Sequence, residues 1–167
     1  CTPEARPFVL VSAILASAIG FIDGTVVAIA LPAMRDTLDA SLPQAQWINN
    51  GYLLPLSALI LFGGALGDRL GLARVFATGI CLFVLASMIC AISPTAEILI
   101  AARVAQGIGA ALMVPGSLAL IARAYPPEER GRAIGIWAAS AAMTTALGPI
   151  IGGLALSFGG PEMWRVI

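Results

Sequence analysis

The chain has 167 residues, of which 59% are hydrophobic and 11% are charged, and its formal net charge is zero. A soluble domain is typically about 45–50% apolar and about 25% charged, so this composition excludes an ordinary soluble domain. Its hydrophobicity also excludes a disordered chain. The composition predicts a membrane protein, and the balanced charge predicts no nucleic-acid partner.

Five stretches with at most one charge each are long enough to cross a membrane, since a spanning helix needs about 20 apolar residues. Each must be helical, because an open strand leaves its backbone groups unpaired in lipid. The sequence therefore predicts an all-α membrane protein with five complete spans. The expected spans cover residues 8–32, 46–66, 75–93, 98–122 and 133–158.

The end of the chain looks like the beginning of another span, with Trp164 and Arg165 as interfacial anchors. A sixth span is therefore expected to begin at about residue 164. We expect residues 1–167 to form an N-terminal transmembrane half-domain, with the C-terminal half of the protein missing from this sequence.

The arginines indicate the orientation of the chain in the membrane. Loops on the cytoplasmic side carry an excess of basic residues. With a cytoplasmic N-terminus, six arginines fall on the cytoplasmic side and two on the outer side. The six are Arg6, Arg69, Arg74, Arg123, Arg130 and Arg132, and the two are Arg35 and Arg165. This bias predicts a multi-pass protein of the cytoplasmic membrane with its N-terminus inside.

Residues typical of enzyme active sites are scarce. The chain has no His, which removes the usual general base and metal ligand. Cys81 and Cys90 lie about 13 Å apart if helical, too far for a disulfide, and we interpret both as small lipid- or helix-facing residues. No nucleophile–base pair is visible, so the sequence predicts neither an enzyme nor a metal site.

Two charges lie inside the expected spans, although each costs at least about 2.5–3.5 kcal/mol there. Asp23 precedes Pro32 by nine residues, which places it about 13 Å below the outer end of its helix. Arg103 follows Glu97 by six residues, about 9 Å below the same face. The two could therefore face each other. The pair predicts a site for protons or a substrate cation, and the alternative is a structural pair that fixes helix packing.

The segment 64–74 joins the second and third spans. It packs three charges and three glycines into what we expect to be a tight cytoplasmic turn. Asp68 is expected to cap a neighbouring helix or to pair with an arginine. The alternative is a plain charged turn.

The fifth span is rich in glycine. Gly148 and Gly152 have the spacing of a small-residue contact face, and Pro149 between them removes a backbone hydrogen bond. These residues predict a helix that packs closely and bends. The alternative is that Gly and Pro are simply common in spanning helices.

These features occur together and in order, and the sequence thereby resembles the major facilitator superfamily, most closely its 14-helix drug:proton antiporter branch. Segment 64–74 resembles the family signature between the second and third helices. It matches at Gly64, Leu66, Gly67, Asp68, Arg69 and Gly71, with Leu72 and Ala73 at two basic positions of the pattern and Arg74 one place on.

Three further segments carry the resemblance. Residues 22–32 resemble the first-helix motif of the 14-helix branch. The fourth-helix motif matches at Leu99, Arg103, Gln106, Gly107, Gly109, Ala110 and Ala111. The antiporter motif of the fifth helix matches at Gly135, Gly148, Pro149, Gly152 and Gly153, with Thr144 where the pattern has Gly.

The resemblance implies alternating access, in which two six-helix halves rock about a central cavity. It implies proton coupling or substrate binding by Asp23, Arg103 and Gln106. It implies a cytoplasmic gate made by the segment that holds Gly64, Asp68, Arg69, Gly71 and Arg74. The fifth helix would lie between the halves.

The function that we expect is proton-coupled export of drugs or other small molecules. The proton gradient supplies the energy and no cofactor is needed. The expected partners are the substrate, protons, membrane lipid and the missing half of the transporter. Two alternatives stay open: a transporter of a metabolite such as a sugar or organic acid, and a truncated membrane subunit that transports nothing.

Overall fold

The computed structural model describes residues 3–166, and these form helices joined by short connections. The five long helices are α1 (Arg6–Thr37), α2 (Leu42–Leu70), α3 (Leu72–Ile92), α4 (Ala96–Ala124) and α5 (Pro127–Gly159). Two short 3-10 helices, η1 (Pro3–Ala5) and η2 (Pro161–Arg165), lie at the ends. No strand occurs in this part of the chain, so the predicted all-α class is confirmed.

All five long helices are long and apolar enough to cross a membrane. The shortest, α3, has 21 residues, which at about 1.5 Å per residue matches a hydrocarbon core of about 30 Å. Each of the other four helices extends beyond its expected span at both ends. The additional turns carry most of the charged residues, which therefore lie on helix ends rather than in loops.

The connection between α2 and α3 is shorter than expected. Helix α2 continues to Leu70 and α3 begins at Leu72, so Gly71 alone lies outside the two helices. The expected turn over residues 64–74 is therefore wrong in its extent. Gly71 has φ +99°, a conformation that glycine adopts without strain, and one such residue is enough to reverse the chain.

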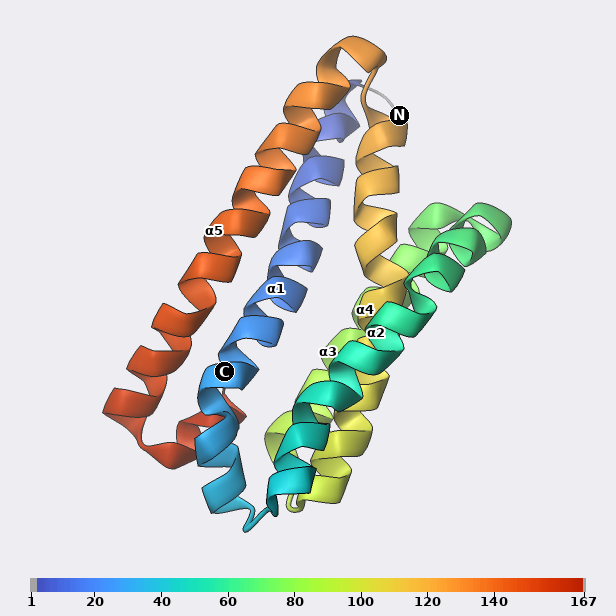
Figure 1. The fold of residues 1–167 in the computed structure, drawn as a ribbon. Helices are drawn as coiled ribbons and strands as arrows, with labels where there is room; N and C mark the ends of the chain where they lie inside the picture. Colours follow the sequence, from blue (N-terminus) through green and yellow to red (C-terminus); the bar gives the residue numbers. More distant parts are fainter. Residues whose placement is uncertain (1–2, 167) are drawn as a thin grey trace.

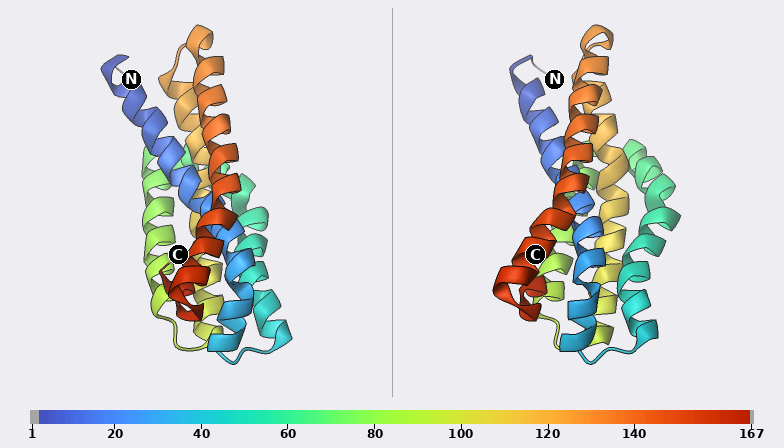
Figure 2. Two further views of the ribbon diagram at one scale, coloured as in Figure 1. Left: turned by 90° about the vertical axis from the view of Figure 1, so that its left-hand side faces the viewer. Right: turned by 60° about the vertical axis from the view of Figure 1, so that its left-hand side comes forward.

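The helices pack as a pair and a group of three (Figure 1). Helices α1 and α5 run along each other, while α4 packs extensively against both α2 and α3. Helix α1 also contacts α4 and α2, which joins the pair to the group, and Figure 2 shows the same arrangement from two further sides. Close approach depends on glycine: a Cβ at Gly107 would collide with the carbonyl oxygen of Tyr52.

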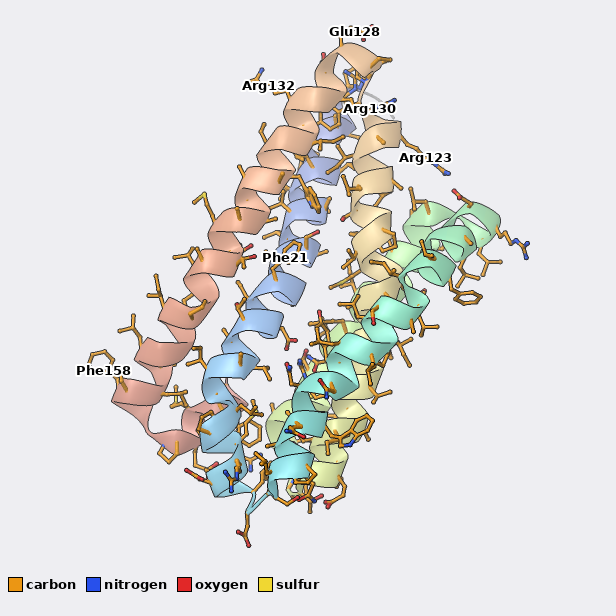
Figure 3. All side chains as sticks on the ribbon, viewed as in Figure 1. Phe21, Arg123, Glu128, Arg130, Arg132 and Phe158 are labelled. Carbon is orange, nitrogen blue, oxygen red and sulfur yellow. The ribbon has the colours of Figure 1, made fainter. Side chains whose placement is uncertain are left out.

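The helix connections lie alternately at the two ends of the molecule. The α2–α3 and α4–α5 connections share one end with the N-terminus, and the α1–α2 and α3–α4 connections lie at the other (Figure 1). Arg123, Glu128, Arg130 and Arg132 gather at the first end, opposite Phe158 (Figure 3). Because the connections alternate between the two ends, most of the arginines lie at the end that holds the N-terminus. The cytoplasmic position of that end stays a prediction.

The end of the described chain folds back onto the other helices. Residues 161–165 form η2, and the indole Nε1 of Trp164 donates a hydrogen bond to Thr37 Oγ1 at 2.8 Å. Arg165 donates to the carbonyl oxygen of Ser93 at 2.7 Å. Trp164 was expected to be an interfacial anchor, but it is buried because it packs against α1. The expected sixth span would continue past the described residues.

Candidate functional site

The two charges of the spans meet between α1 and α4. Nη1 of Arg103 on α4 donates to both carboxylate oxygens of Asp23 on α1, at 2.8 Å to Oδ1 and 2.6 Å to Oδ2. The Arg103 side chain is 2% exposed and the Asp23 side chain 17%. Mutual neutralisation explains how the membrane tolerates both charges, because an unpaired charge there is far more costly.

Gln106 connects this ion pair to α3. Its carbonyl Oε1 accepts a hydrogen bond from Arg103 Nη1 at 2.8 Å, and its Nε2 donates to Asp23 Oδ1 at 3.2 Å. On the α3 side, Nε2 also donates to Ser87 Oγ at 2.7 Å, and the thiol of Cys90 donates to Oε1 at 3.3 Å. Three helices thus hold one polar cluster, defined here as Asp23, Ser87, Cys90, Arg103 and Gln106.

Arg103 has further contacts with α2. Its Nε donates to the carbonyl oxygen of Ile48 at 3.3 Å, and its Cζ lies 4.5 Å from the centroid of the Tyr52 ring. A guanidinium over an aromatic face is attracted by the ring quadrupole. Within residues 3–166, Nη2 of Arg103 is buried and has no hydrogen-bond partner.

A small cavity opens beside the cluster, and it is called the polar cavity below because charged and amide side chains form part of its wall. Its volume is about 80 Å³, and Asp23, Arg103 and Gln106 line it. Trp164 and Arg165 of η2 also contribute to the lining. The partial exposure of Asp23 is therefore exposure to a space large enough for water, which needs at least about 10–15 Å³.

The residues of the signature segment lie at the arginine-rich end. Asp68 Oδ1 and Arg123 Nη2 on α4 are 2.9 Å apart, so Asp68 pairs with an arginine rather than capping a helix. Both side chains are mostly exposed, at 72% and 61%, so the pair contributes little to stability. Arg69 and Arg74 form no ion pair within residues 3–166, and Gly64 lies one turn before Asp68 on α2.

The structure divides the glycines of the fifth-helix motif into two sets. Gly148 and Gly152 are buried against α1, where a Cβ would meet Thr25 Oγ1 and, at 3.3 Å, Val26 Cγ1 respectively. Gly135 and Gly153 face open space within the described chain. Pro149 lies inside α5. The close contact between α1 and α5 therefore depends on half of the motif's glycines.

Sequence reasoning missed Tyr52 and Ser87, and treated Cys90 as a packing residue. Ser87 and Cys90 are three positions apart in a charge-free span, which places them on one face of a helix. That spacing of two polar side chains is the signal that could have identified them. Tyr52 gives no comparable signal, because its contact with Arg103 depends on how α2 is rotated.

Comparison with known proteins shows the family. The family model described as Major Facilitator Superfamily matches residues 13–167. The methylenomycin A resistance protein of Bacillus subtilis is 43% identical over 162 residues, which cover 94% of this chain and 34% of that protein. The tetracenomycin C resistance and export protein of Streptomyces glaucescens is 42% identical over 153 residues, which cover 89% of this chain and 28% of that protein.

A solved structure has the same fold. The crystal structure of a bacterial homolog to the human lysosomal transporter Spinster, in an inward-facing and unoccupied conformation, matches with a TM-score of 0.82 at 22% identity. The match covers 99% of this chain and 40% of that one.

This chain therefore belongs to the major facilitator superfamily, a family of membrane transporters. The resemblance seen in the sequence is confirmed, as are a multi-pass location in the plasma membrane and a role other than that of an enzyme. The chain spans about a third of the length of the two relatives described above. Its assignment to the 14-helix branch stays a prediction.

Proposed function

We propose that the full-length protein is a proton-coupled exporter, which exchanges protons for drug-like small molecules by alternating access. The observation that carries this proposal is a carboxylate inside the membrane, Asp23, which is paired with Arg103 and partly exposed to a polar cavity. Buried ionisable groups in spanning helices commonly belong to proton or substrate pathways. Resistance and export relatives support the direction of transport.

Protonation changes the charge of the cluster. With Asp23 ionised, the pair has no net charge; with Asp23 protonated, Arg103 remains as an unpaired cation. Because an unpaired buried charge is costly, the two protonation states favour different arrangements of the surrounding helices. Proton uptake can thereby be coupled to a conformational change, and no cofactor is required.

The other motif residues have proposed roles in the same cycle. The ion pair of Asp68 with Arg123 would hold the ends of α2 and α4 together at the cytoplasmic face, in contact with a C-terminal half. The second half would also contact α5. The N-terminus would be cytoplasmic, as the arginine bias predicts.

The experiment that tests coupling uses the full-length protein in inverted membrane vesicles with an imposed pH gradient. The substrates are methylenomycin A and tetracenomycin C, the compounds in the relatives' names. Asp23→Asn keeps the shape of the side chain and removes its ability to bind a proton. We therefore expect the rate of proton-driven uptake into the vesicles to fall at least about 100-fold, which lies in the range expected for the loss of one essential proton-transfer group.

The matched control is Asp39→Asn, the same substitution in the connection between α1 and α2. It should leave uptake within about twofold of the wild type, as expected for a surface substitution. Both variants must be present in the membrane in equal amounts. Undiminished proton-driven uptake by Asp23→Asn would show that Asp23 does not couple protons to export.

A further inference from the structure

A second cavity lies next to the polar cluster and has the opposite character. Its volume is about 260 Å³, and residues of α1, α2, α4 and α5 line it. Among residues 3–166, the lining holds no charged side chain. The hydroxyls of Thr25 and Thr145 donate to backbone carbonyls of their own helices, and Ser17 Oγ accepts from the indole of Trp137. These three hydroxyls are therefore hydrogen-bonded, the other lining residues apart from Tyr52 have apolar side chains or none, and the space is mainly apolar.

Helix α1 presents different faces to the two cavities. Asp23 and Val27 line the polar cavity, whereas Phe21, Gly24 and Thr25 line the apolar one. The Asp23 carboxylate is thus turned away from the apolar cavity, although its sequence neighbours contribute to the wall. Both carboxylate oxygens are already bound by Arg103, and one also accepts from Gln106.

Tyr52 stands between the two spaces. It is 4% exposed and lines the apolar cavity, while the Arg103 guanidinium lies 4.5 Å from its ring centroid. A second aromatic ring, Phe83, meets Tyr52 edge-on with centroids 6.5 Å apart and supports its orientation. The ring therefore contacts the Arg103 guanidinium and also forms part of the wall of the apolar cavity, which Arg103 itself does not line.

We propose that Tyr52 is a specificity-determining residue: its ring separates the apolar cavity from the Asp23–Arg103 pair, so the cavity accepts uncharged aromatic compounds in preference to cations of the same shape. The proposal rests on the proposed function, because it treats this cavity as part of the substrate path. It narrows the substrate class from drug-like molecules in general to uncharged, largely apolar ones.

The physical reason is the cost of burying a cation without a partner. A cation in the apolar cavity cannot reach a free carboxylate oxygen, and the neutral ion pair exerts little net attraction on it. Cation–π attraction to Tyr52 does not compensate, because the ring already binds the Arg103 guanidinium and that positive charge repels a second cation.

The test is a binding measurement on the purified full-length protein in detergent. The probes are acridine and N-methylacridinium, which share one ring system and differ in charge, at a pH where acridine is uncharged. We expect the wild type to bind acridine at least about tenfold more tightly, since tenfold corresponds to only about 1.4 kcal/mol. Tyr52→Phe keeps the ring and should leave this ratio within about twofold of the wild-type value.

Tyr52→Leu removes the ring and joins the cavity to the ion pair. The preference for acridine should then fall at least about fivefold, because without the ring the cation can approach the ion pair closely enough to compete with Arg103 for the Asp23 carboxylate. If Tyr52→Leu does not fold, Tyr52→Met is the second variant. The longer side chain of methionine leaves a smaller void than leucine does. The matched control is Leu56→Ala, which enlarges the same cavity one turn further along α2 and should change both affinities alike.

Several outcomes would overturn the inference. They are equal or tighter binding of the cation by the wild type, no binding of either probe, and a shift in Leu56→Ala as large as that in the ring-deleted variants. The measurement needs no proton gradient, so it is independent of the coupling test. If Asp23→Asn abolishes proton-driven export while the ratio does not depend on Tyr52, only the present inference fails. If the ratio behaves as expected while Asp23→Asn still exports, the proton-coupled function fails.

Discussion

Arg103 shows how a single charged side chain is accommodated in a membrane span. It contacts a carboxylate on α1, a backbone carbonyl and an aromatic face on α2, and an amide on its own helix. These contacts replace much of the hydration that the guanidinium loses. A buried ion pair is by itself weak evidence for stability, but removing one partner leaves a costly charge behind.

This asymmetry gives a prediction for the free energy of unfolding of the full-length protein in detergent. Arg103→Leu leaves Asp23 unpaired and should cost about 3–5 kcal/mol, whereas Arg103→Leu combined with Asp23→Leu should recover most of the loss. A double-mutant cycle measures the coupling between the two side chains.

The matched control is the same cycle on Asp68 and Arg123, a pair of similar distance at an exposed position. Its coupling should be about 0–1 kcal/mol. A coupling between Asp23 and Arg103 no larger than this would mean that the buried pair does not stabilise the helices against each other.

The charged residues of the site could be predicted from the sequence, whereas its aromatic residue could not. Asp23 and Arg103 could be identified because a charge in an apolar span is conspicuous, and helix rise placed them at similar depth. Tyr52 could not be linked to Arg103, because the rotation of α2 about its axis follows from packing against α4 rather than from residue spacing.

At the scale of helices, the contact between α1 and α5 depends on residues without side chains. Gly148 and Gly152 lie one turn apart on α5 and allow Thr25 and Val26 of α1 to approach. The sequence predicted this small-residue face from its spacing, but not that α1 is the helix it packs against.

Gly148→Ala should destabilise the full-length protein by about 1–3 kcal/mol, because the added methyl group collides with Thr25 Oγ1. The expected result is a lower unfolding free energy in detergent. Gly153→Ala is the control on the same helix, since its methyl group meets open space and should have little effect.

A second substitution identifies the cause. Thr25→Ala removes the atom that the new methyl group would strike, so it should restore part of the stability lost in Gly148→Ala. Equal effects of Gly148→Ala and Gly153→Ala, or no recovery with Thr25→Ala, would argue against this packing.

The extent of the helices was predicted less well than their number. Hydropathy alone places the charged residues next to the apolar spans in loops, although most of them extend the helices by whole turns. The clearest case is the α2–α3 connection, where Asp68, Arg69 and Arg74 all lie on helices. Hydropathy indicates where the apolar, lipid-facing part of a helix ends. The helix itself continues past that point as long as its backbone hydrogen bonds continue.

For the whole molecule, the alternation of helix connections makes the orientation testable. In a cysteine-free background of the full-length protein, Gly71→Cys should react with an impermeant thiol reagent only from the cytoplasmic side. Asp39→Cys lies in the connection at the other end and should react only from outside. Labelling with the opposite sidedness would reverse the topology.

The up-and-down course of the helices could be predicted because it follows from the number and order of the spans. The orientation in the membrane depends on the distribution of arginines and stays a prediction. The division into an α1–α5 pair and an α2–α4 group could not be predicted, because helices far apart in sequence carry no complementary pattern that identifies them as neighbours. The ion pair of Arg6 on α1 with Glu129 on α5 illustrates this, since the charged ends of the helices offer several oppositely charged partners.

The lengths of the connections set how far neighbouring helix ends can separate. At the arginine-rich end, one residue joins α2 to α3 and two join α4 to α5; at the other end, four join α1 to α2 and three join α3 to α4. A fully extended chain spans about 3.3–3.6 Å per residue, so Leu70 and Leu72 stay within about 7 Å, while Thr37 and Leu42 can part by up to about 17 Å. The longer connections therefore lie at the end where η2 lies. The ends of consecutive helices can move further apart there than at the arginine-rich end.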